Sequence, residues 1–455
     1  MMCYIILHNE LLKQAGGKSM ATKMKMNEIP RGTEDLIGKE ARLRDWVINM
    51  VRNVYEKYGL EPLYTPIIEN AEVFNGHHGE GENLLFSFKD KCGEDLVLKY
   101  DSTVPLARVV SMHPEIPRPY KRYQFQESFR DDETDKGHYR AFIQLDADIV
   151  GVETMLGDAE CVMMAYEALS ELGFNDFTIR LNHRKIIKAI AQKAGETSKE
   201  GFLEIQRAID YADKVIKNGI EGIRQDLERR NISSSVIKII CEIVEKITDN
   251  PVDTLENIRK YFSDNPVAQE GINELEEILS YIPNRMMPKV KIDFTLARGA
   301  DYYTGSIFEA KINGIELGAV LGGGRFDQLV EAFSSEKIPA VGFAIGMERI
   351  IVALKELWLT ERMEYPRKLF ILDAKNPEMI KKISKCANQL RNYLDVSILY
   401  GISDYKAALD YVKAKAEQYW AVVKLEKSGE VKIKGGSEDT ISIVRQIFER
   451  EGYLI

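Results

Sequence analysis

The chain has 455 residues, of which 45% are hydrophobic, and this excludes an intrinsically disordered protein and predicts two to four folded domains. A net charge of −9 argues against a protein that binds nucleic acid over its whole surface, although residues 367–455 carry 16 basic and 12 acidic side chains, a net charge of +4. No apolar run approaches the roughly 18 residues of a membrane span. Five scattered cysteines without a C-x-x-C pair, and histidines without metal-ligand spacing, predict no disulfide framework and no metal site, and fit a reducing cytoplasm.

The first 183 residues predict a mixture of helices and strands. Apolar residues at helical spacing predict a helix over 38–58 that ends at Gly59. Strands are expected over 60–68, 95–100, 123–129, 141–150 and 177–181, with a second helix over 154–172. Pro62 and Pro66 place the first of these strands at a sheet edge or an interface. The charged loop over 130–140 joins two strands and can cover a ligand.

Residues 184–285 change character, because they are rich in Ile, Lys, Glu and Ala at helical spacing. They predict an inserted helical module, after which strand signals resume over 289–294. A hairpin is expected over 307–312 and 315–321 around the turn Asn313-Gly314, followed by a helix from 326, a strand over 339–346 and a helix over 347–357. After a linker over 361–367, strands and helices alternate over 368–451, which predicts a compact α/β domain.

The segment Leu296-Ala-Arg-Gly-Ala-Asp-Tyr-Tyr-Thr-Gly305 combines a cation, a carboxylate and two phenols within six residues. A buried strand would need a partner for each polar tip, whereas a pocket for a small zwitterion can use them all. Arg298 can bind a carboxylate or a phosphate, and Tyr302 and Tyr303 can line a pocket and donate hydrogen bonds. Taken alone, the segment fits an ordinary polar loop equally well.

Three further patterns are ambiguous in isolation. Gln144, Asp146 and Asp148 share one face of a strand, which is either an exposed face or the floor of a site. The glycine run 322–324 is weak evidence for phosphate binding. Arg349 falls in the first turn of a helix after Gly346, where it is either a surface arginine or an anion ligand.

Together these residues resemble histidyl-tRNA synthetase, a class II aminoacyl-tRNA synthetase, in its archaeal and eukaryotic style. The matching motifs are Pro30–Asp35 (the family's opening motif), Gly59–Pro66 (motif 1), Tyr123–Gly151 (motif 2), Gly342–Arg349 (motif 3), and Asp101–Pro105 and Arg298–Tyr303 (the histidine-specific motifs). The resemblance extends from about residue 28 to the end of the chain. The two histidine-specific motifs distinguish this family, whereas motifs 1 to 3 indicate only the class.

The resemblance implies an α+β fold, with a class II antiparallel sheet flanked by helices. The implied domains are a catalytic core (26–183 and 286–360), a helical insertion domain (184–285) and an α/β anticodon-binding domain (367–455). Residues 1–25 are expected to be an N-terminal extension that is either disordered or an artefact of the start site.

The implied function is that of a histidine–tRNA ligase. Such an enzyme activates L-histidine with ATP to histidyl-adenylate and transfers the histidine to the 3′ end of tRNA(His), releasing AMP and pyrophosphate. The substrate carboxylate is already ionised at neutral pH, so the first step needs positioning and cations rather than a general base. The family also implies a cytoplasmic homodimer without a membrane segment, with Mg²⁺ bound through the ATP phosphates.

The resemblance also implies roles for single residues. Arg130 and Arg298 are the expected catalytic residues, with Arg130 on the α-phosphate and Arg298 on both that phosphate and the histidine carboxylate. ATP is expected to contact Arg130, Phe142 and Arg349, which would hold the α-phosphate, the adenine and the γ-phosphate. The expected histidine-binding residues are Asp101, Thr103, Arg130, Gln144, Asp148, Arg298, Tyr302 and Tyr303.

The chain departs from the family pattern at three places. His138 stands where the family usually has arginine, Ser102 replaces an apolar residue, and residues 423–436 lack a glycine-glutamate turn. Two other functions therefore remain in view: a regulatory paralogue such as the synthetase-like subunit of ATP phosphoribosyltransferase, and an RNA-binding module. The expected C-terminal domain, together with Arg130, Arg298 and Arg349, argues for the enzyme, because such paralogues lack that domain.

Overall fold

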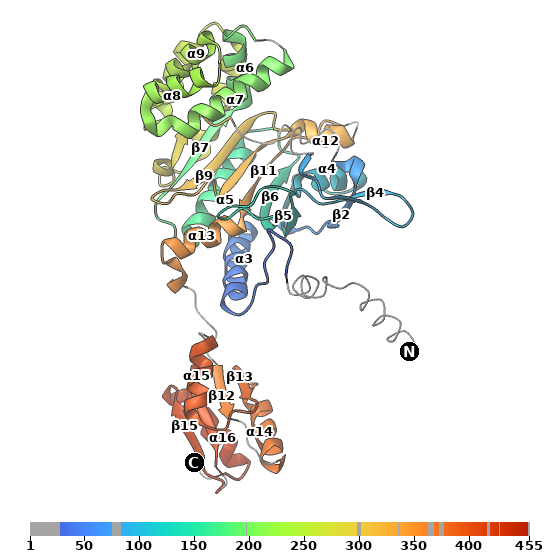
Figure 1. Cartoon of the computed structure of the whole chain (residues 1–455), viewed down its shortest axis with the longest axis vertical. Helices are drawn as coiled ribbons and strands as arrows, with labels where there is room; N and C mark the ends of the chain where they lie inside the picture. Colours follow the sequence, from blue (N-terminus) through green and yellow to red (C-terminus); the bar gives the residue numbers. More distant parts are fainter. Residues whose placement is uncertain are drawn as a thin grey trace, which may run out of the picture. The chain divides into compact units, whose positions relative to one another are not determined.

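The structure is a computed structural model of the whole chain (Figure 1). It describes residues 28–74, 83–196, 198–297, 302–334, 336–362, 368–372, 377–415, 419–426 and 428–453. The N-terminal extension expected over 1–25 and the residue Arg298 lie outside these ranges. The chain divides into two compact units, the second of which contains residues 358–455.

The first unit is built on an eight-stranded sheet in the order β1-β5-β6-β11-β10-β9-β7-β8. Its strands are β1 (Glu61–Pro62), β5 (Tyr120–Phe129), β6 (Ala141–Val150), β7 (Phe177–His183), β8 (Val290–Ile292), β9 (Ser306–Ile312), β10 (Leu321–Arg325) and β11 (Ala340–Gly346). The six strands from β5 to β7 pair antiparallel, and only the short edge strands β1 and β8 pair parallel. The predicted antiparallel sheet is confirmed.

The register of this sheet explains why one of its faces is hollow. Gln144, Asp146 and Asp148 of β6 pair directly with Gly346, Ala344 and Gly342 of β11. Directly paired residues share a face of the sheet. The polar side chains of β6 therefore lie beside residues of β11 that have no side chain or only a methyl group. A Cβ at Gly342 would come 2.0 Å from Asp148 Oδ1, so the glycine is required there. The hollow therefore follows from small residues on β11 beside polar ones on β6.

The opposite face of the sheet is apolar and is covered by helices. Leu145, Ala147 and Ile149 of β6 are fully buried. The covering helices are α3 (Lys39–Lys57), α5 (Leu156–Glu171) and α13 (Met347–Glu356). Tyr55 of α3 sets its ring edge against Phe343 and donates its hydroxyl to the carbonyl of Leu145 at 3.1 Å. Packing on the apolar face thus fixes the position of β6, and with it the polar side chains that β6 presents on the opposite face.

A small three-stranded sheet and two helices lie beside the β5–β6 hairpin. The strands are β2 (Ile68–Asn70), β3 (Ser87–Lys89) and β4 (Asp95–Leu98), in the order β2-β4-β3. Helix α4 (Thr103–Met112) begins shortly after β4 and packs on α12 (Asp327–Phe333) around a shared apolar cluster. The N-terminus of α4 is thereby fixed at the rim of the hollow face.

Among the described residues between β7 and β8 there are six α-helices. They are α6 (Arg184–Lys193), α7 (Lys199–Val215), α8 (Gly219–Arg229), α9 (Ser234–Val244), α10 (Pro251–Tyr261) and α11 (Pro266–Tyr281). Helices α6–α9 gather beyond the β7 edge of the sheet, as the green helices of Figure 1, whereas α11 packs on α5 and β7. Helical spacing correctly predicted this all-helical stretch, whereas its limits as a separate domain remain a prediction.

The second unit is an α/β domain, as predicted. Its four-stranded sheet has the order β13-β12-β14-β15, formed by β12 (Lys368–Leu372), β13 (Val396–Leu399), β14 (Tyr419–Leu425) and β15 (Val431–Gly435). Its helices are α14 (Pro377–Leu390), α15 (Tyr405–Lys415) and α16 (Glu438–Arg450). The strand β15, which pairs antiparallel with β14, was not predicted.

Two expectations about strands are wrong. The predicted strand over 60–68 is reduced to the two residues of β1, although β1 does lie at the sheet edge. The second strand of the hairpin, expected over 315–321, is a loop. Strand β10 begins at Leu321 and runs through the glycines 322–324, for which no strand was predicted. Glycine is required in β10 because a Cβ at Gly323 would come 2.4 Å from the carbonyl oxygen of Gly342.

Candidate active site

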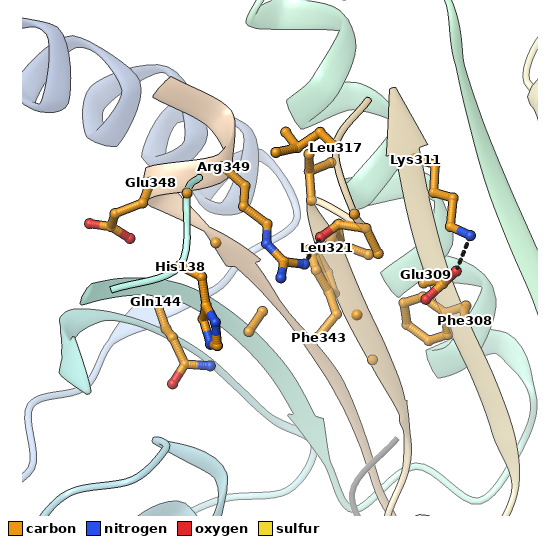
Figure 2. A pocket seen from close by; sticks show the side chains of 18 of the residues that line it. His138, Gln144, Phe308, Glu309, Lys311, Leu317, Leu321, Phe343, Glu348 and Arg349 are labelled. Carbon is orange, nitrogen blue, oxygen red and sulfur yellow. Dashed lines mark hydrogen bonds and ion pairs between the residues drawn. The ribbon is translucent and has the colours of Figure 1, made fainter. Parts of the chain in front are cut away.

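The hollow face of the sheet contains a cavity of about 1070 Å³. Its walls come from β6, β9, β10, β11, the N-terminus of α4, the loop of the β5–β6 hairpin and the first turn of α13. Figure 2 shows Arg349 reaching in from α13, with His138 and Gln144 on one side and Glu309 and Lys311 on the other. A cavity of this size, walled by both apolar and polar groups, is typical of a small-molecule site.

Asp101 is held at one end of the cavity by the start of α4. Its Oδ1 accepts hydrogen bonds from the backbone N–H groups of Thr103 and Val104, both at 3.1 Å, and its Oδ2 accepts one from the Tyr302 hydroxyl at 3.3 Å. Both oxygens of this carboxylate are thus fixed by hydrogen bonds at the start of α4. Asp101, Thr103 and Tyr302, expected from the sequence to bind histidine, therefore lie together.

Tyr302 and Tyr303 both line the cavity, with ring centroids 5.0 Å apart. Burial, and then the charge of Asp101 for Tyr302 or of Asp148 for Tyr303, raises the pKa of each phenol. Both hydroxyls are therefore neutral donors at physiological pH. Residues 298–301 lie outside the described residues. The predicted role of Arg298 therefore stays a prediction from the sequence.

The floor of the site is polar and buried, which decides between the two interpretations of the β6 pattern. Gln144, Asp146 and Asp148 are only 9%, 2% and 2% exposed. Within the described residues, Gln144 Oε1 and Asp146 Oδ2 have no hydrogen-bond partner. Buried polar atoms in folded proteins are nearly always paired. Gln144 lines the cavity, so its unpaired oxygen points to a ligand, whereas Asp146 lies behind the cavity wall.

Arg122 of β5 supplies the positive charge beneath this floor. Its Nη2 lies 2.6 Å from Asp148 Oδ2 and donates to the carbonyl of Ser102 at 3.1 Å. Burial raises the pKa of Asp146 to about 7 and that of Asp148 to about 6, and Arg122 opposes both shifts. Asp148 lies against Arg122 and Gly342 and does not line the cavity. Arg122 was not predicted, because an arginine in a strand is typical of a solvent-exposed position.

Arg130 lies at the end of β5 and lines the cavity, as expected. Its guanidinium lies between two rings, with Cζ 4.2 Å from the centroid of Tyr100 and 5.0 Å from that of Phe142. Its buried Nε has no hydrogen-bond partner among the described residues. Two aromatic faces hold the cation without neutralising it, so it remains available to an anion.

Arg349 reaches the cavity from the first turn of α13 and is not a surface arginine. Its Nη1 donates to the carbonyl of Ala319, in the loop before β10, at 2.6 Å. Gly137 and Gly318 pack against its side chain, since a Cβ at either would come within 3.2 Å of it. The loop over 315–320, predicted as a strand, is thus part of the site.

Two ionisable side chains accompany Arg349. Burial raises the pKa of Glu348 to about 7, and its Oε1 accepts the backbone N–H of Ile143 at 3.3 Å. His138 lies on the hairpin loop, with Nε2 3.6 Å from Asp132 Oδ2. Sequence reasoning did not select Glu348, although its position beside Arg349 in the first turn of the helix was a usable signal.

These contacts place Asp101 and Gln144 in the wall of one cavity with the cations Arg130 and Arg349. Comparisons with known proteins place the chain in a family. The family model of histidyl-tRNA synthetase matches residues 32–350. The chain belongs to the histidyl-tRNA synthetase family. The predicted family and the predicted α+β fold are therefore confirmed.

Relatives extend this match along the chain. The histidine–tRNA ligase of Aeropyrum pernix is 39% identical over 331 residues, covering 72% of this chain and 74% of that protein. The histidine–tRNA ligase of Clostridium tetani is 33% identical over 411 residues, covering 87% and 92%. The crystal structure of histidyl-tRNA synthetase from Nostoc sp. PCC 7120 superposes with a TM-score of 0.74 at 26% identity, covering 93% of this chain and 99% of that chain.

A second solved structure shares only the fold. It is described as an ATP phosphoribosyltransferase regulatory subunit/histidyl-tRNA synthetase from Bacillus halodurans C, with a TM-score of 0.69 at 21% identity, covering 87% of this chain and 97% of that chain. Separately, no helix in the described part of the chain is both long and apolar enough to cross a membrane.

Proposed function

We propose that the chain is an active histidine–tRNA ligase that uses the cavity described above. Its membership of the family and its curated ligase relatives support the reaction itself. The observation that carries the proposal is that the cavity joins a carboxylate end, around Asp101, to two separate cations, Arg130 and Arg349. A zwitterionic amino acid beside a triphosphate needs this distribution of charge.

In the first half-reaction, an oxygen of the histidine carboxylate attacks the α-phosphorus of ATP. The bond from that phosphorus to the bridging oxygen of the β-phosphate breaks, and pyrophosphate leaves. Arg130 stabilises the negative charge at the α-phosphate, and Arg349 holds the γ-phosphate after exchanging its contact with Ala319 for the phosphate. Arg298 completes the set by binding both the α-phosphate and the substrate carboxylate. The adenine lies against Phe142, on the ring face that Arg130 leaves open.

Recognition of histidine divides between the two ends of the pocket. Asp101 and Gln144 accept hydrogen bonds from the α-ammonium group, with Thr103 beside them. Tyr303 holds the imidazole and Tyr302 lines the pocket. Asp148, expected from the sequence to share this role, lies behind the cavity wall on Arg122 and acts through it. A site built to pair both ring nitrogens rejects apolar analogues, because its own buried groups would otherwise be left unpaired.

Mg²⁺ would arrive with the phosphates of ATP and neutralise their charge. Glu348 fits such an ion, because it is a buried carboxylate that lines the cavity beside Arg349. In the second half-reaction the terminal adenosine hydroxyl of tRNA(His) attacks the activated carbonyl and AMP leaves. The α/β domain would contact the anticodon, and the helices α6–α11 would contact the acceptor arm.

The assembly is proposed to be a homodimer with motif 1 at its interface, and light scattering on dilute protein would test this. The four described cysteines outside the N-terminal stretch are free thiols, which supports a reducing, cytoplasmic location.

Charging of a tRNA(His) transcript with labelled histidine tests the proposed function. Histidine should become attached to tRNA(His), and a transcript of another tRNA is the control. If folded protein charges neither transcript although it binds histidine, the regulatory paralogue is the better account.

A further inference from the structure

Arg180 of β7 has a complete set of hydrogen bonds although it is only 6% exposed. Its Nε donates to Asp293 Oδ2 at 2.7 Å. Its Nη1 donates to Glu309 Oε1 at 2.6 Å and to Asp213 Oδ2 at 3.3 Å, and its Nη2 donates to Asp213 Oδ1 at 2.6 Å and to Thr295 Oγ1 at 2.9 Å. A guanidinium has five N–H groups, so every donor is used.

These partners come from three parts of the chain that are far apart in sequence. Asp213 lies on α7, Glu309 on β9, and Asp293 and Thr295 in the loop that follows β8. The Thr295 hydroxyl also contacts Asp213 and Asp293, at 3.2 and 2.6 Å. Although burial opposes the shift, Asp293 and Asp213 raise the pKa of Arg180, and Arg180 in turn lowers the pKa of Asp213. The cluster therefore joins a helix of the inserted module to the sheet through fixed charges.

The same region holds the chain on both sides of residues 298–301. On the near side, Asn182 Nδ2 donates to the carbonyl of Leu296 at 2.8 Å, and Gln206 Nε2 of α7 donates to that of Ala297 at 3.4 Å. On the far side, Arg184 Nε donates to the carbonyl of Tyr303 at 3.2 Å. Leu296 and Tyr303 line the cavity, and so do Asp213 and Glu309 from the Arg180 cluster.

We infer that Arg180 is a positioning residue: it ties α7 to the loop that leads into the 296–303 segment, so the docking of the helical module sets one wall of the active site. Arg180 itself does not line the cavity. Because all five donors are used at once, a shift of α7 that withdraws Asp213 leaves a buried cation short of partners and disturbs Thr295 directly. The inference rests on the proposed function in one respect: the kinetic assay uses the proposed reaction.

The kinetic test compares Arg180→Met with Arg259→Met in histidine-dependent exchange of pyrophosphate into ATP. Arg259 is a matched control, because its guanidinium bonds Gln269, Asn273 and Glu276 between α10 and α11 without touching the segment. Arg180→Met should lower kcat about 10- to 100-fold, since misplacement by about 1 Å has that effect, with KM for ATP nearly unchanged. Arg259→Met should stay within about 2-fold of the unsubstituted protein.

A second measurement does not depend on activity. Hydrogen exchange of the peptide covering residues 294–304 should be faster in Arg180→Met than in Arg259→Met, because its anchors are released. If Arg180→Met does not fold, Asp213→Asn replaces it, with the same expected direction in both measurements and a kcat loss of about 3- to 10-fold. Arg180→Lys, which keeps the charge but not the fork, should recover only part of kcat.

The outcomes separate the two proposals. If the unsubstituted protein shows no exchange reaction, the proposed function fails, and hydrogen exchange still decides the role of Arg180. If the unsubstituted protein is active, and the Arg180 or Asp213 variants match Arg259→Met in both kcat and hydrogen exchange, the inference is overturned.

Discussion

Arg180 and Arg122 are buried arginines toward opposite ends of the same face of the sheet, but their surroundings differ. All the donors of Arg180 are paired, and each of its carboxylate partners is engaged. Around Arg122, its own Nε, Gln144 Oε1 and Asp146 Oδ2 have no hydrogen-bond partner among the described residues. A completed polar network stabilises a fold, whereas an incomplete one in a cavity wall is explained by a ligand. The two clusters border the same cavity, through Asp213 and Glu309 at one end and Gln144 at the other, and the unpaired oxygen of Gln144 marks its end as the binding end.

The largest expected effect is a loss of unfolding free energy, and it should differ between Arg180→Met and Arg122→Met. Arg180→Met leaves three carboxylates, those of Asp213, Asp293 and Glu309, without their shared guanidinium and should cost about 3–5 kcal/mol of unfolding free energy. Asp146 and Asp148, with pKa values of about 7 and 6, can take up protons instead. Arg122→Met should therefore cost about half as much at pH 6. Urea unfolding at that pH measures both, and equal losses would contradict the comparison.

The next prediction concerns Arg298, whose role in binding the ligand is inferred from the sequence alone. Arg298→Ala should lower the rate of adenylate formation by about 100-fold or more, as removal of one charge-stabilising donor commonly does. Its unfolding free energy should barely change, unlike that of Arg180→Met. Pyrophosphate exchange and urea unfolding on the same preparations separate the two effects. Unchanged activity would show that Arg298 is not in the site.

Gln144→Leu should raise KM for histidine about 10-fold or more, because an acceptor for the α-ammonium group is lost. KM for ATP should stay constant. Stability should be unchanged or higher, since the substitution removes a buried oxygen without a partner. The matched change at the paired end, Thr295→Val, should instead lower stability, because its hydroxyl is fully engaged. A loss of stability in Gln144→Leu would mean that its amide is already satisfied in the free protein.

The smallest effect is on pH dependence. Asp146 keeps its proton in the folded protein up to about pH 7, whereas the unfolded chain loses it near pH 4, so the free energy of unfolding falls as pH rises through this window. Histidine brings a positive α-ammonium group and favours the ionised carboxylates, so its affinity should rise between about pH 5.5 and 7.5. Calorimetric titration with histidine measures this affinity, and Asp146→Asn should flatten the profile more than Asp213→Asn. Equal flattening by the two variants would place the titrating group elsewhere.

Sequence patterns predicted most of the elements, because alternation and helical spacing are local. They failed where packing overrides propensity. The glycine run 322–324 carries no strand signal, yet it forms β10, where neighbouring backbone leaves no room for a Cβ at Gly323. Ile315 to Val320 alternate like a strand but form the loop whose Ala319 carbonyl holds Arg349.

The site was predicted residue by residue through the family resemblance, and the described members of the set largely come together. Asp101, Arg130, Gln144, Tyr302, Tyr303 and Arg349 all line one cavity. Arg122 and Arg180 were not predicted, because their partners lie on other strands, a helix and loops that only the folded chain brings together. Long-range pairing of this kind leaves no local signal.

The central claim is that histidine is activated at the incompletely paired end of the sheet face. Histidine-dependent exchange of pyrophosphate into ATP tests this claim most directly. The protein should exchange label when histidine is present and not when another amino acid replaces it, and Gln144→Leu should require about 10-fold more histidine to do so. Absence of exchange in well-folded protein, or exchange with the same histidine requirement in Gln144→Leu, would contradict that claim.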